Sequence, residues 1–135
     1  MAAKTFQTMA GGMSPEAAFL AARDGARQWV GEAGHSGTIA EKTEYRLAIG
    51  RPAELSAPAY AEQLAALPPA PGILVRCSAD DAWTLEQEGS FYRTLPATPT
   101  TPLAHDLAVF HSETGPALCI ASGPGEWLFC GTAAA

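Results

Sequence analysis

The residues of this sequence best suited to chemistry lie in the run GHSGTIAEK and just after it. His35, Ser36, Glu41 and Lys42 stand within eight residues, and Tyr45 follows three positions later. They supply an imidazole, two hydroxyls, a carboxylate and an amine, which are the groups used for proton transfer and for polar recognition. The pattern therefore indicates a binding site, with His35, Ser36, Glu41, Lys42 and Tyr45 as candidate residues.

The direction of the Glu41 side chain decides what kind of site this is. If one unbroken strand runs from Thr38 to Ile49, Glu41 shares a face with Tyr45 and the apolar residues of that strand, and Lys42 points the other way. A carboxylate on that face must be paired, protonated or at the mouth of a pocket. A turn between Ala40 and Thr43 would reset the alternation and leave Glu41 in water, or Glu41 would make only a structural contact. The sequence leaves both interpretations open.

The remaining reactive residues match no compact catalytic or metal-binding motif. The three histidines, His35, His105 and His111, have no spacing typical of a metal site. His-Ser at 35–36 and His-Asp at 105–106 contain the residue types of a catalytic triad, but there is no G-x-S-x-G turn to present a nucleophile. We therefore expect no metal and no cofactor, and an enzyme is less favoured than a binding protein.

The net charge indicates which kinds of partner the protein can bind, and the cysteine spacing indicates the redox state of its compartment. The chain has 135 residues and a formal net charge of -6, and it has too few basic residues to favour nucleic-acid binding. No apolar run reaches the length of a membrane span, and the three cysteines have no C-x-x-C spacing, which favours buried thiols in a reducing compartment. We expect a cytoplasmic protein that binds another protein and not a membrane.

Two helices are indicated by their starting residues. Ser14 is a favoured N-cap, Pro15 suits the first helical position, and apolar residues recur at three- and four-residue steps up to Ala33, before Gly34. A second, shorter helix is predicted to begin at Ser56 or Ala57 and to end before the pair of prolines at 68–69.

Several other runs are predicted to form strands. Alternating or β-branched runs bounded by turn residues occur at 4–10, 38–49, 73–77 and 91–92, and in DLAVFHS, PALCIAS and WLFCGTA, while 83–88 is predicted to be a short element of unassigned type. The last three runs are separated by short turns, which is typical of an antiparallel meander. The predicted fold is one α+β domain over residues 1–135, an antiparallel sheet of five or six strands with one long amphipathic helix on a face and a possible second short helix.

The final hairpin can be assigned a register. A turn centred between Pro124 and Gly125 places Cys119 opposite Cys130 and Ile120 opposite Phe129. Both faces of the hairpin are apolar, so we expect it to be central in the sheet and covered on both sides.

Two stretches of the chain carry a resemblance to a known group. The run GHSGTIAEK after an alanine-rich helix, and the ending GPALCIASGPGEWLFCGTA, resemble short uncharacterised proteins of tailed bacteriophages and of mostly actinobacterial bacteria. That group carries a Gly-x-[Ser/Thr]-Gly-Thr-Ile-Ala-Glu-Lys motif. The sequence departs from the group at His35-Ser36, where Tyr-Thr is usual, and at Cys130 and Thr132, where aromatic residues are usual. The resemblance implies a phage or mobile-element accessory protein and no particular chemistry.

Two functions follow as hypotheses. The first is a small interaction protein that binds a host or phage protein. Inhibition of that partner and formation of a homodimer are left open. The alternative is a small-molecule-binding protein or enzyme with a pocket around His35, Glu41 and Tyr45.

Overall fold

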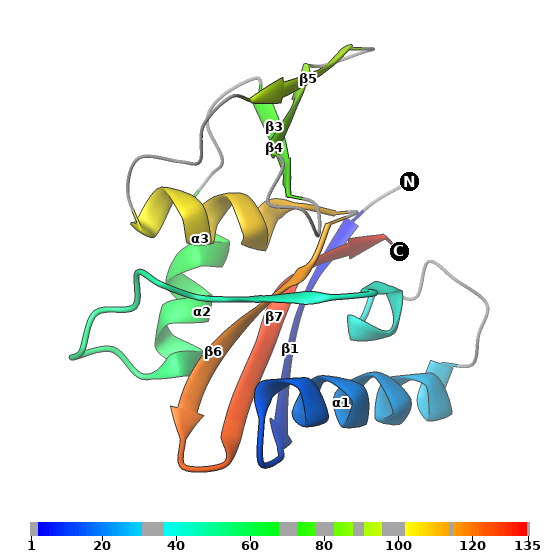
Figure 1. Cartoon of the computed structure of the whole chain (residues 1–135), viewed down its shortest axis with the longest axis vertical. Helices are drawn as coiled ribbons and strands as arrows, with labels where there is room; N and C mark the ends of the chain where they lie inside the picture. The colour runs from blue at the N-terminus through cyan, green and yellow to red at the C-terminus, as the bar shows by residue number, and fades with distance from the viewer. Residues whose placement is uncertain are drawn as a thin grey trace.

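A computed structural model describes residues 3–30, 37–67, 73–77, 83–87, 91–95, 102–113 and 115–134. In this part of the chain the fold is α+β, with a four-stranded mixed sheet, a three-stranded sheet and three α-helices (Figure 1). The elements are β1 (Ala3–Gly11), α1 (Pro15–Val30), a 3-10 turn η1 (Ile39–Glu41), β2 (Tyr45–Leu47), α2 (Ala57–Ala66), β3 (Ile73–Cys77), β4 (Trp83–Gln87), β5 (Phe91–Leu95), α3 (Pro102–His111), β6 (Ala117–Gly123) and β7 (Glu126–Ala134).

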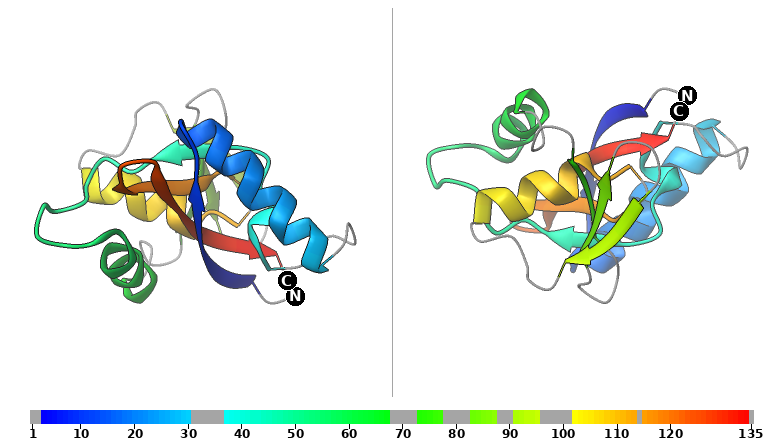
Figure 2. Two further views of the ribbon diagram at one scale, coloured as in Figure 1. Left: turned by 90° about the horizontal axis from the view of Figure 1, so that it is seen from below. Right: turned by 90° about the horizontal axis from the view of Figure 1, so that it is seen from above.

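The four-stranded sheet has the order β1-β7-β6-β2. β7 is antiparallel to both β1 and β6, whereas β2 is parallel to β6, so β1 and β2 run in the same direction at opposite edges. The chain crosses from β1 to β2 through α1 and returns to β6 through α2 and α3. Figure 1 shows α1 on one side of the strands and α2 with α3 on the other. Ala3 lies opposite Ala134, which brings the two ends of the chain together (Figure 2).

The face of the sheet under α1 is built around three aromatic rings. The ring centroids of Phe19 and Tyr45 are 5.2 Å apart, those of Phe19 and Phe129 5.5 Å, and those of Tyr45 and Phe129 5.9 Å. Tilted and edge-to-face arrangements at these separations are the favoured geometries for aromatic pairs. Phe6 from β1 and Ile39 from η1 complete this buried cluster.

The opposite face is covered by α2 and α3. A second cluster of buried residues joins these helices to the central hairpin, and its largest members are Tyr60, Leu64, Val109, Phe110, Leu118, Ile120 and Leu128. β6 and β7 therefore contribute apolar side chains to both faces. The prediction that the final hairpin is central and covered on both sides is confirmed.

Both predicted helix starts are confirmed. The hydroxyl of Ser14 accepts a hydrogen bond from the Ala17 amide (3.2 Å), and that of Ser56 accepts one from the Ala59 amide (3.2 Å). These bonds satisfy amide groups that have no partner within the first turn of a helix. α1 is described as far as Val30, so its predicted ending at Gly34 lies outside the described residues.

The predicted single antiparallel sheet of five or six strands is wrong in detail. The described residues form seven strands in two sheets, and β2 makes the larger sheet mixed. The run DLAVFHS, predicted to be a strand, belongs to helix α3. Pro102 begins this helix, and Asp106, Val109 and Phe110 are buried together at helical spacing, which an alternating strand would have separated.

The run from Thr38 to Ile49 is not one unbroken strand. The Thr38 hydroxyl accepts a hydrogen bond from the Ala40 amide (3.2 Å), and the Lys42 amide bonds to the Ile39 carbonyl (2.9 Å), which closes the turn η1. Only β2, three residues long, remains as strand. A turn between Ala40 and Thr43 is therefore the interpretation that the structure bears out.

The predicted register of the final hairpin is displaced by one residue. Cys119 lies opposite Phe129 and Leu118 opposite Cys130. The turn itself is where it was predicted, with Gly123 opposite Glu126, but the register shifts between Ala121 and Gly123 because Ser122 is an extra residue. This shift sends the Cys119 side chain to the α1 face and that of Cys130 to the face of α2 and α3.

Replacing Phe129 by alanine tests the packing under α1. We expect Phe129→Ala to lower the free energy of unfolding by about 3 to 5 kcal/mol, because a fully buried ring that contacts two others is removed. Leu20→Ala, at an exposed position of α1, is the control and should change it by less than about 1 kcal/mol. Urea denaturation measures both, and equal effects would contradict the described core.

Candidate functional site

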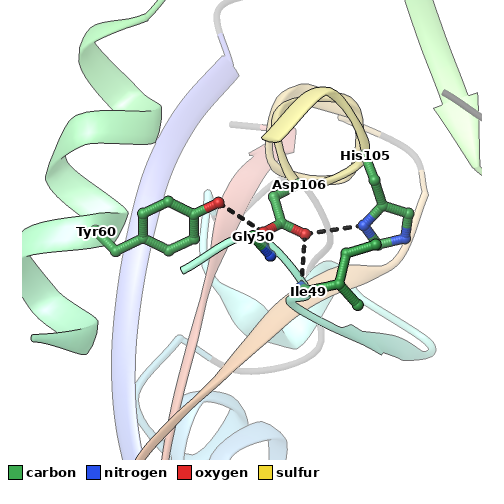
Figure 3. Close-up of polar contacts among 5 residues, drawn as sticks. All are labelled: Ile49, Gly50, Tyr60, His105 and Asp106. Atoms are coloured by element: carbon green, nitrogen blue, oxygen red, sulfur yellow. Dashed lines mark hydrogen bonds and ion pairs between the residues drawn. The ribbon is translucent and has the colours of Figure 1, made fainter. Parts of the chain in front are cut away.

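A buried carboxylate is the centre of the most connected polar cluster among the described residues. Asp106, in α3, is fully buried and accepts four hydrogen bonds (Figure 3). Its Oδ1 accepts from the amide of Ile49 (3.0 Å) and lies 2.8 Å from Nδ1 of His105. Its Oδ2 accepts from the amide of Gly50 (2.7 Å) and from the hydroxyl of Tyr60 (2.6 Å).

These bonds keep the carboxylate ionised inside the protein. Burial alone raises the pKa of Asp106, but the hydrogen bonds from His105, Tyr60 and the two backbone amides outweigh this effect and lower the pKa below its ordinary value of 3.8. Burial and the bond to the carboxylate raise the pKa of Tyr60, so its hydroxyl stays protonated and donates a hydrogen bond to the ionised Asp106. Asp106 therefore carries a negative charge at neutral pH.

The cluster joins three parts of the chain that are distant in sequence. Asp106 is in α3, Tyr60 is in α2, and Ile49 and Gly50 follow directly after β2. Gly50 is required by the close approach of α3, because a Cβ at this position would stand 2.8 Å from the carbonyl carbon of Pro102. The path of the chain after β2 is thus fixed by a charged hydrogen-bond acceptor and by a backbone contact.

His105 lies at the outer side of this cluster. Its side chain is 16% exposed, and its Nδ1 is directed at the carboxylate of Asp106. With Asp106 ionised, Nδ1 carries the proton and the tautomer of the ring is set, as in Asp–His pairs that position an imidazole for proton transfer or metal binding. In the part of the chain that the structure describes, no group of three His, Cys, Asp or Glu side chains is placed to hold a metal ion.

Exposed apolar side chains surround the end of β2. Leu47 is 49% exposed, Ile49 60% and Leu103 37%. Leu103 lies next to the loop after β2, because its backbone nitrogen is 2.9 Å from where a Cβ of Gly50 would be. We call these three residues the β2-end patch. Within the patch, the amide of Ile49 is bound by Asp106, which also binds the amide of the next residue, Gly50.

The structure places the candidate residues of the sequence in different environments. His35 and Ser36 lie outside the described residues. Lys42 is buried, and its Nζ donates hydrogen bonds to the carbonyl oxygens of Ser112 (2.7 Å), Glu113 (3.2 Å) and Gly115 (3.1 Å). All three donors of the ammonium group are directed into the segment that connects α3 to β6.

The burial of Lys42 affects its protonation. Removal from water lowers the pKa of this amine to about 8, and the nearby charge of Glu113 opposes that shift. The amine is therefore still charged at neutral pH. Because its donors are already used within the chain, Lys42 holds the fold together at this point.

Glu41 and Tyr45 lie on either side of this anchor. Glu41 ends the turn η1 and is partly exposed. Tyr45 packs its ring against Phe19 and Phe129, and burial together with the charge of Glu16 raises its pKa. The described residues thus place Lys42 against the segment before β6 and Tyr45 in the aromatic cluster under α1.

Sequence reasoning missed Asp106 as the centre of a polar cluster. In the sequence, His105 and Asp106 have the residue types of an incomplete triad or metal site, and the run that begins at Asp106 is predicted to be a strand. The available signal was helical spacing, since Asp106, Val109 and Phe110 occupy one face of a helix and place a carboxylate at a core position. A carboxylate there requires donors, but nothing in the sequence identifies the amides of Ile49 and Gly50 as those donors.

Comparisons with known proteins leave the family open. No protein-family profile matches this chain, and searches of curated proteins and of solved structures also found no match. Among the described residues, none of the helices combines the length and the apolar character needed to cross a bilayer.

Changing Asp106 tests the charged cluster. We expect Asp106→Asn to lower the free energy of unfolding by about 2 to 4 kcal/mol at pH 7, because an amide group then faces donors that need an acceptor. Because its pKa is lowered, Asp106 binds fewer protons in the native state than in the unfolded state. The stabilisation by its ionised carboxylate is therefore present above about pH 4, and it is lost as the pH falls through the pKa that Asp106 has in the folded protein. The difference between wild type and variant should shrink on acidification.

Urea titrations from pH 7 to pH 3 provide the measurement. Asp24→Asn, on the exposed side of α1, makes the same change in charge and should cost less than about 0.5 kcal/mol. A cost for Asp106→Asn no larger than for this control would show that the four hydrogen bonds do not stabilise the fold.

Lys42→Met tests the buried amine. Methionine has a similar length but no donors, so three carbonyl oxygens lose their partner, and we expect a loss of about 2 to 4 kcal/mol in the free energy of unfolding. Hydrogen exchange should accelerate at the Ala117 amide, which bonds to the Glu44 carbonyl beside this anchor. Unchanged stability and exchange would contradict the role of Lys42 as an anchor.

Proposed function

We propose that this protein is a small protein-binding module that recognises its partner through the β2-end patch. The observation that supports the proposal is the exposure of Leu47, Ile49 and Leu103 around one rigid loop. Single exposed apolar residues are common on soluble proteins, but a group of them on adjoining segments is typical of a contact surface.

The backbone under the patch supports this interpretation. The amides of Ile49 and Gly50 are bound by a buried carboxylate, so the loop that presents Ile49 has little freedom to lose when a partner binds. Apolar side chains held in this way are suited to act as anchors in a protein interface.

Charge indicates the kind of partner. The net charge of -6 favours a partner with a basic surface and disfavours nucleic acid, which would need a basic patch. On the resemblance to phage proteins, we propose that the partner is a host or phage protein in the bacterial cytoplasm. Inhibition of that partner is one version of this proposal.

The alternative is a small-molecule site or enzyme around His35, Glu41 and Tyr45. Two observations weigh against it in the described residues: the ring of Tyr45 is part of the aromatic cluster, and the amine of the neighbouring Lys42 is used by backbone carbonyls. The protein-binding proposal is therefore the one that the geometry supports better.

A matched pair of substitutions tests the patch. We expect Ile49→Lys to weaken capture of a specific protein from a bacterial lysate strongly, because it places a charge in the centre of the apolar contact. Met13→Lys, at another highly exposed position, makes the same change in charge and should capture that protein as the wild type does. Quantitative mass spectrometry of parallel affinity purifications measures the enrichment, expected to fall at least about tenfold for Ile49→Lys.

Folding of both variants is checked by circular dichroism. A partner that Ile49→Lys retains at wild-type levels would place the interface elsewhere. Absence of any protein enriched by the wild type over beads, at low salt, would count against the proposed function as a whole.

A further inference from the structure

Among the described residues, β1 is an edge strand, and no other described strand pairs with its outer side. It is the first strand in the order β1-β7-β6-β2, and it runs for nine residues, from Ala3 to Gly11. Its register with β7 is continuous over all nine, so no bulge interrupts it. Natural proteins usually shorten, bend or charge such an edge, because its unpaired backbone groups can bind another strand.

The backbone groups that face the open side can be identified. The Gly12 amide donates to the carbonyl of Gly125, which lies directly opposite in the register continued from β1 and β7 (3.0 Å). Facing residues in antiparallel strands alternate between bonded and non-bonded pairs, so the even-numbered residues of β1 bond to β7. Thr5, Gln7 and Met9 therefore direct their N–H and C=O groups outward.

The open side is complementary to a second copy of itself. Gln7 is the middle residue of β1, so an antiparallel pair of β1 strands about a two-fold axis at Gln7 overlaps along the full strand. In this register Gln7 faces Gln7 of the second copy, and Thr5 faces Met9 in both directions. These side chains are exposed, and all three residue pairs present their outward amides and carbonyls to one another.

The low charge of β1 and the small residues on the neighbouring flank of α1 are also compatible with a second copy at this edge. β1 holds one charged residue, Lys4, and no acidic residue, although the chain as a whole is acidic. Phe19 marks the flank of α1 that faces β2, where it contacts Tyr45. The opposite flank carries the small residues Ala17, Ala21 and Gly25, and a Cβ at Gly25 would meet no atom within 4 Å.

We propose that two copies of this protein associate through β1, in antiparallel register centred on Gln7, to form one continuous eight-stranded sheet. The two α1 helices then lie on the same face, next to each other across the two-fold axis. This association uses the edge opposite β2, so the β2-end patch stays exposed on both copies.

Two double variants test the register. Thr5→Lys/Met9→Lys places like charges opposite each other in both symmetric pairs, whereas Thr5→Lys/Met9→Glu places opposite charges there. The first changes the net charge from -6 to -4 (-6 + 2), and the second leaves it at -6 (-6 + 1 - 1), so general repulsion between copies would predict the reverse order. Sedimentation velocity over a range of protein concentrations measures the dissociation constant.

We expect a dimer for the wild type, at least about tenfold weaker dimerisation for the Lys/Lys variant, and wild-type or stronger dimerisation for the Lys/Glu variant. A wild type that is monomeric at all concentrations up to several hundred micromolar overturns the proposal. A dimer that both variants leave unchanged, or weaken equally, overturns the assignment to β1.

Hydrogen exchange gives a readout on the wild type alone. The amides of Thr5, Gln7 and Met9 should become protected as the protein concentration rises, while those of Phe6 and Thr8 are protected at every concentration by their bonds to β7. Protection of Thr5, Gln7 and Met9 that does not depend on concentration overturns the proposal. Ile49→Lys should dimerise as the wild type does, which separates this inference from the proposed function.

Discussion

The position of β2 depends on two buried charges. β2 is only three residues long, and its pairing with β6 is parallel, which offers little stabilisation by itself. Before it, the ammonium group of Lys42 binds three carbonyls between α3 and β6. After it, the carboxylate of Asp106 binds the amides of Ile49 and Gly50. The strand is thus fixed at both ends by charge-assisted bonds to α3 and the segment that follows it.

This arrangement explains why the fold tolerates polar groups in its interior. Each buried charge is surrounded by several partners, so the cost of removing it from water is offset by hydrogen bonds that only the folded chain can make. The bonds reach across 46 to 73 residues of sequence, and they bring the crossover through α2 and α3 back against the sheet. Packing on the two faces of β6 and β7 then completes both apolar clusters.

Local signals in the sequence predicted the starts of two helices and several strands, but they did not predict α3, the turn η1 or the arrangement of the elements. Ser14, Pro15 and Ser56 predicted two helix starts correctly, because capping depends on neighbouring residues alone. The prediction of a strand for DLAVFHS was wrong because Leu107 and Val109 alternate with other residues as they would in a strand. The burial of Asp106 and Phe110 depends on contacts with α2 and with the chain around β2, which the sequence does not show. Of the candidate site, the sequence identified Lys42 as notable but could not show its acceptors, which lie about 70 residues away.

The extra residue Ser122 in the final hairpin has a chemical consequence for the two cysteines. Cys119 and Cys130 would have been cross-strand neighbours in an unshifted register, but they project from opposite faces of the sheet, and both are free. Burial raises the pKa of Cys119 to about 12 and also raises that of Cys130, so neither sulfur is present as the reactive thiolate. A covalent link between them would require the strands to move. At these two positions the sulfur atoms therefore act as small apolar packing groups.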